Sequence, residues 1–100
     1  MDGQATISSE ILASYAADAA REVAGVRGLA ASPLPGRGGV RIGREDAGLR
    51  VEVHLVVEWG ASIPEVGRQV RERVREYLLR MADAEPAAIE VVVDEIGPRP

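Results

Sequence analysis

The sequence predicts an α+β fold in two layers, with two helices covering one face of a three- or four-stranded mixed sheet. Apolar side chains take every second position of residues 49–59, which is typical of a strand that buries one face. Residues 63–81 instead repeat apolar side chains at three- and four-residue spacing, which is typical of a helix with one buried stripe. With the weaker segments added, the elements follow in the order (β)αββαβ, where the bracketed strand is optional.

The first half of the chain is predicted to contain one helix and one strand. Residues 1–6 are a frayed polar lead-in, and the optional edge strand would end at Ile7. Ser8 is the predicted N-cap of a helix whose inward positions include Ile11, and Gly25 supplies the left-handed residue on which helices commonly stop. The apolar residues 26 and 29 are expected to pack over the C-terminal end of this helix. Residues 31–39, rich in proline and glycine, form a flexible loop before a strand that starts at residue 40 and turns at residues 44–48.

The second half begins with the long strand and a clear helix start. Gly60 interrupts the alternation, and the segment from Ser62 to Glu65 has the pattern of a capping box. In that motif the Ser62 hydroxyl accepts from the backbone N–H of Glu65, and the Glu65 side chain reaches back to the N–H of Ser62. Pro64 falls in the first turn, where a missing N–H costs nothing.

The last predicted strand covers residues 89–93. Because a helix joins it to the long strand, the two strands are expected to run parallel through a right-handed crossover. Residues 97–100 are expected to fray, and residues 1–100 to form one domain.

Composition excludes several classes of function. The chain has no cysteine, which removes disulfides and thiolate chemistry, and it has one histidine, His54. The net charge of −4 argues against general polyanion binding, because phosphate affinity needs clustered positive charge. No apolar run approaches the roughly 20 residues that span a bilayer, so we expect a cytoplasmic protein without direct membrane insertion. No cofactor motif is present in the sequence.

The candidate chemical sites each have a plainer structural interpretation. Because His54 lies on the charged face of the long strand, it would need convergent partners to act as a base or metal ligand, and a surface histidine is favoured. Gly36-x-x-Gly39 matches the loop by which KH domains clamp nucleic acid, but it leads into a strand rather than a helix, so no nucleic-acid partner is expected.

Trp59 has the inward parity of the strand and is predicted to be core. Four acidic side chains could gather across strands to bind a cation, although solubility and edge protection are favoured: Glu52, Glu58, Glu90 and Asp94.

Three surfaces could serve protein contacts. Two helices leave the second sheet face uncovered, where Val56 and Val92 would form an apolar centre inside a charged rim if their strands are adjacent. Leu79 falls in the middle of the charged face of the second helix, as a contact residue or as an ordinary exposed leucine. Ala13 and Ala17 lie on the outer side of the first helix, either as good helix formers or as a smooth packing surface. A homo-oligomer is therefore expected.

Four segments resemble one bacterial family. They are Ile7-Ser8 ahead of the first helix, residues 22–26 (Glu-Val-Ala-Gly-Val), residues 57–66 (Val-Glu-Trp-Gly-Ala-Ser-Ile-Pro-Glu-Val) and residues 89–93 (Ile-Glu-Val-Val-Val). In this order the chain is similar to the alkaline-shock, or envelope stress response, protein family over residues 7–96. Trp59 departs from the pattern, since a tyrosine is common at that place.

The resemblance implies a small cytosolic protein tied to cell-envelope homeostasis, with no family catalytic residue to transfer. It also implies that a separate anchor protein can bring relatives to the membrane. We therefore expect a non-catalytic scaffold or adaptor. A regulatory module that binds a metabolic enzyme or a small acidic or acyl ligand is the alternative, and an RNA-binding KH-like module is a remote one.

Overall fold

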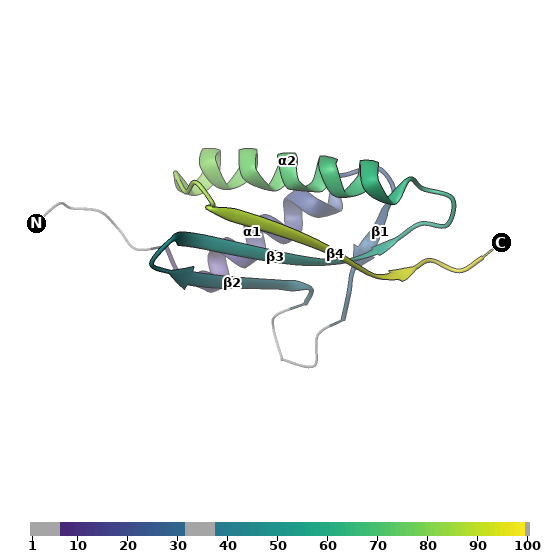
Figure 1. The fold of residues 1–100 in the computed structure, drawn as a ribbon, viewed down its shortest axis with the longest axis horizontal. Helices are drawn as coiled ribbons and strands as arrows, with labels where there is room; N and C mark the ends of the chain where they lie inside the picture. Colours follow the sequence, from purple (N-terminus) through teal and green to yellow (C-terminus); the bar gives the residue numbers. More distant parts are fainter. Residues whose placement is uncertain (1–6, 32–37, 100) are drawn as a thin grey trace, which may run out of the picture.

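Two helices lie on one face of a four-stranded sheet in the computed structural model, which describes residues 7–31 and 38–99 (Figure 1). This arrangement confirms the predicted α+β class. The elements in chain order are α1 (Ser9–Arg21), β1 (Val26–Leu29), β2 (Val40–Glu45), β3 (Gly48–Val57), α2 (Ile63–Ala82) and β4 (Ala88–Ile96).

The long strand β3 is the common partner of the other three strands. β4 pairs with it in parallel along one edge, from Arg50↔Ala88 to Val57↔Ile96. On the other edge β2 pairs with the first half of β3 and β1 with its end, both antiparallel. The parallel β3–β4 pair agrees with the crossover expected from the sequence.

β1 was not predicted as a strand: residues 26 and 29 were expected only to cover the end of the first helix, whereas Val26–Leu29 pair with β3. The optional strand before the first helix falls outside the described residues, apart from Ile7, which is not in a strand. Of the predicted flexible loop, residues 32–37 also lie outside the described residues.

The core lies between the helices and the inner face of the sheet. Alternate residues of β3 are fully buried there, and α2 contributes one apolar stripe. The largest fully buried side chains of the core are Leu12, Val51, Val53, Leu55, Val57, Val70, Val74 and Leu78.

Four residues predicted to face inward are exposed. Ile11 is 45% exposed, whereas Leu12, Ala16 and Ala20 of the same predicted face are buried. Ile63 and Met81, at the two ends of the apolar stripe of α2, are 39% and 46% exposed. Trp59 is 51% exposed, since β3 ends at Val57 and the alternation no longer applies beyond it.

The helix ends follow local sequence signals, with two differences from expectation. α1 ends at Arg21, earlier than predicted, and Gly25 instead forms the turn into β1 with φ of +93°. At the start of α2 the Ser62 hydroxyl accepts from the backbone N–H of Glu65 at 3.4 Å. The Glu65 carboxylate does not close the capping box but bonds to Arg68 Nη2 at 2.6 Å, within the same turn.

Replacing Ser62 with alanine should lower the free energy of unfolding by about 1 kcal/mol, because the first turn of α2 loses the acceptor for one backbone N–H. Urea denaturation followed by circular dichroism measures this loss. Ser8→Ala is the matched variant at the other helix and should cause a similar loss, since the Ser8 hydroxyl caps α1 by accepting from the N–H of Ile11 at 3.1 Å. An unchanged midpoint for Ser62→Ala would mean that water replaces the cap at no cost.

Candidate interaction surface

The sheet face opposite the helices, which we call the open sheet face, carries mostly charged side chains. It is formed by Arg41 of β2, alternate residues of β3 from Arg50 to Val56, and Glu90 and Val92 of β4. Both helices lie on the other side of the sheet (Figure 1). Glu52, His54, Val56 and Val92 are only partly exposed, because neighbouring side chains shield one another across the strands.

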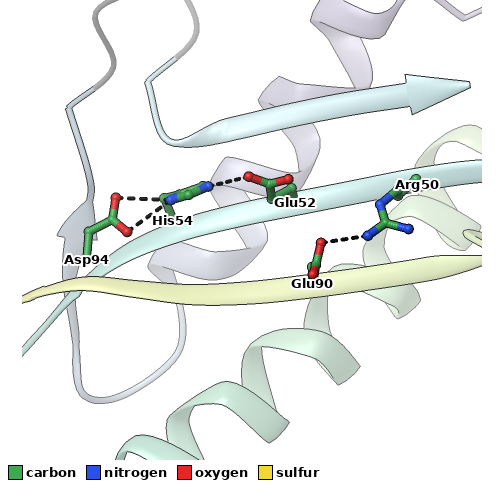
Figure 2. Close-up of polar contacts among 5 residues, drawn as sticks. All are labelled: Arg50, Glu52, His54, Glu90 and Asp94. Atoms are coloured by element: carbon green, nitrogen blue, oxygen red, sulfur yellow. Dashed lines mark hydrogen bonds and ion pairs between the residues drawn. The ribbon is translucent and has the colours of Figure 1, made fainter.

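His54 stands at the centre of this face between two carboxylates (Figure 2). Its Nε2 lies 2.5 Å from Oε2 of Glu52, and its Nδ1 lies 3.0 Å from Oδ2 of Asp94. The period of β3 places Glu52 and His54 on the same face. A bulge between the Leu55↔Val93 and Val56↔Glu95 pairs makes Asp94 the extra residue of β4, and this residue reaches the imidazole.

The geometry favours the charged form of the histidine. A neutral imidazole donates from one nitrogen only, whereas both nitrogens of His54 face carboxylate oxygens. The hydrogen bonds to Glu52 and then Asp94 raise the pKa of His54 above its ordinary value of 6.5, and partial burial opposes this. The same bond to His54 lowers the pKa of Glu52.

Next to this triad, Arg50 and Glu90 form an ion pair across β3 and β4 at 2.9 Å (Figure 2). Both side chains are about half exposed, so the pair contributes little to stability. Its effect is to neutralise two opposite charges on the face.

Three of the four acidic side chains predicted to gather here are bonded to basic groups. Glu52 and Asp94 are bonded to His54, and Glu90 to Arg50. In the part of the chain that the structure describes, no group of three histidine or acidic side chains is arranged to hold a metal ion. The contacts of His54 were only partly foreseen: Glu52 follows from strand parity, but Asp94 depends on the register of β4.

The predicted contact residues occupy different surroundings. Val56 and Val92 both lie on the open sheet face on adjacent strands, where Val92 pairs with His54 and Val56 pairs with Glu95. Val92 is therefore the cross-strand neighbour of His54, and Val56 is its same-face neighbour along β3. Leu79 is exposed on α2, which lies on the opposite side of the sheet.

The alanine side of α1 does not form the expected surface. Ala17 is only 8% exposed and belongs to the core, and Ala13 is partly buried and packs against it. The expectation that these two alanines offer a free surface is thus corrected. Alanine is apolar but small, so its spacing gave a weak indication of which side of α1 faces inward.

A shallow hollow of about 210 Å³ lies where β3 ends and α2 begins. Its apolar lining includes the exposed residues Trp59, Ile63 and Ile96, and the Arg99 guanidinium lies 5.3 Å from the centre of the Trp59 ring. Pockets that enclose small-molecule ligands usually measure roughly 300–1,000 Å³. This hollow is therefore too small and open to enclose such a ligand.

Comparison with known proteins identifies the family of the chain. Residues 1–98 match the alkaline shock protein 23 family, described as having a cell envelope-related function. The chain belongs to this family. The resemblance inferred from residues 7–96 is thereby confirmed.

A relative and two solved structures add detail. YqhY of Bacillus subtilis is 36% identical over 89 residues, which cover 79% of this chain and 66% of YqhY. Two variants of the MamM C-terminal domain have similar folds at 16% identity. One superimposes with a TM-score of 0.59 over 89% of this chain and 98% of that domain. The other, a manganese form, has a TM-score of 0.56 over 86% and 96% of the two chains. At this identity the likeness shows the fold alone.

In the described part of this family member, neither α1 nor α2 is long and apolar enough to cross a membrane.

Proposed function

We propose that the protein is a non-catalytic scaffold or adaptor in cell-envelope stress homeostasis, and that it acts by self-association through the open sheet face. The observation that carries the proposal is the one-sided cover of the sheet, since both helices pack on the same face. The envelope-related description of the family supports the setting. In this proposal the protein is cytoplasmic, reaches the membrane through an anchor protein, and has no nucleic-acid partner.

A second copy is the natural occupant of the open sheet face. Two sheets pack face to face at about 10 Å, so docking would give four layers with both pairs of helices outside. His54 and its two carboxylates would lie near the middle of the contact with Val92 and Val56 beside them. The ion-paired Arg50 and Glu90 would lie nearer its rim. The two valines would supply apolar contact area among these polar groups. A symmetric contact of this kind closes as a dimer, so a larger assembly needs a second surface, for which the exposed Leu79 is our candidate.

Sedimentation velocity over a range of micromolar concentrations tests the proposal. We expect wild-type protein to form a concentration-dependent oligomer and Val56→Glu to shift it toward the monomer, because the contact would bury a new unpaired carboxylate. The far-UV circular dichroism of the variant should stay unchanged, since Val56 lies outside the core.

Ile11→Glu is the matched control. It makes the same kind of change at an exposed apolar residue on α1, away from the open sheet face, and should leave association unchanged. Leu79→Arg should reduce assemblies larger than a dimer without dissociating the dimer. A wild-type chain that stays strictly monomeric at high micromolar concentration contradicts self-association and leaves only partners of other sequence.

A further inference from the structure

The position of the only histidine in the chain suggests how self-association is regulated. On the open sheet face His54 lies next to Val92 across the strands and next to Val56 along β3, so a docked second copy would cover it. We propose that docking of a second copy on this face requires the protonated form of His54, so that alkaline conditions release the second copy. This inference rests on the proposed function and adds the regulation of the same surface.

The hydrogen bonds of Glu52, His54 and Asp94 depend on the proton of the imidazole. The protonated ring satisfies Glu52 and Asp94 together, one from each nitrogen. After loss of the proton, one nitrogen carries a lone pair that faces a carboxylate oxygen at 3.1 Å or less. On the free face water can solvate that carboxylate. Under a docked sheet it would be buried without a donor, which is a costly state for a charge.

Among residues 7–31 and 38–99, the other ionisable side chains on this face are arginines and carboxylates, whose ordinary pKa values lie outside the range from about pH 6 to 9. β1 contributes Gly28, opposite Val56, and the exposed Arg27, which is the extra residue of the bulge between Val26 and Gly28. The remaining ionisable neighbours on β2, β3 and β4 are arginines and carboxylates: Arg41, Glu45, Arg50, Glu52, Glu90, Asp94 and Glu95. The chain has no cysteine, so among the side chains of the described residues His54 is the one whose ordinary pKa falls in this range.

The direction of the effect follows from the pKa shift of His54. The carboxylates raise its pKa in the folded chain, so the pairing stabilises the fold fully below the unfolded pKa of 6.5 and is lost as the pH rises through the folded pKa. Docking adds to this preference for the proton. Since two copies each supply one histidine, the dissociation constant should rise up to about 100-fold per pH unit above the folded pKa.

Sedimentation equilibrium at constant ionic strength, from pH 6 to pH 9, tests the inference with three proteins. We expect the wild-type dissociation constant to rise at least tenfold over this range. His54→Gln, which is always neutral, should associate weakly and independently of pH. His54→Lys, which stays charged, should associate at pH 9 as tightly as at pH 6. The NMR titration of the imidazole should give a transition at the same pH as the loss of association.

The outcomes separate the two proposals. Wild-type protein that does not associate at pH 6 contradicts self-association itself. Wild-type protein that associates at pH 6 and equally at pH 9 overturns the proton requirement while self-association stands. A wild-type pH dependence that persists in His54→Gln assigns the effect to a group other than His54 and also overturns the inference. Circular dichroism at both ends of the range checks that each variant is folded.

Discussion

Val70→Asp should prevent the protein from folding at neutral pH. Val70 is fully buried in the middle of α2, within the apolar stripe that packs against the core. An aspartate there has no partner, so either its charge or its protonated carboxyl group must be buried, at a cost of several kcal/mol. The whole domain is expected to be stable by only about 5–15 kcal/mol. Loss of the far-UV circular dichroism spectrum and of a cooperative thermal transition would show the effect.

Two variants of the same helix control for this result. Leu79→Asp introduces the same side chain at a residue that is 45% exposed, and it should leave the fold intact. Val70→Ala should unfold cooperatively with a loss of about 2 kcal/mol, because it removes buried methyl groups without adding charge. A Val70→Asp protein that melts near the wild-type temperature would contradict the packing of α2 described above.

Gly25→Ala should lower the free energy of unfolding by about 3 kcal/mol, because it combines backbone strain with overpacking. Gly25 has φ of +93°, which side chains disfavour, and its carbonyl accepts from the N–H of Glu58 at 2.8 Å. A methyl group there would lie 2.8 Å from Cγ2 of Val66. Val66 is itself buried on α2 and cannot move aside freely.

Gly60→Ala separates the two causes. Gly60 has a similar φ of +89°, but nothing lies within 4 Å of the position its methyl group would take. We expect a loss of about 1 kcal/mol from strain alone. Urea denaturation of both variants measures the difference, and equal losses would mean that the contact between residue 25 and Val66 is not tight.

Periodic segments could be predicted from the sequence, whereas short ones could not. The alternation in β3 and the apolar stripe of α2 extend over enough residues to fix element type, and Ser62 marked the start of α2. β1 has only four residues, one of them Gly28, and its strand character comes from pairing with β3 far along the chain. No local pattern carries that information.

The open sheet face was predictable from β3 but not from β4. Strand parity places Glu52 beside His54, but the register and bulge that bring Asp94 to the ring arise from packing of the whole strand. Trp59 was misplaced for a related reason, because parity holds only while the strand continues. Sequence thus gives the residues of one strand face, and tertiary packing decides which of them meet.

The central position of β3 also determines when the chain can fold. Every other strand pairs with β3 and, in the described residues, with no other strand. Until β3 has been synthesised, α1, β1 and β2 therefore have no sheet against which to pack or pair. β2 and β3 are joined by a two-residue turn and can pair quickly, whereas β4 must wait for all of α2. On a ribosome the complete pairing of β2 with β3 therefore requires the segment ending at Val53 to have left the exit tunnel. More than half of the chain must be synthesised before this pair of strands is complete.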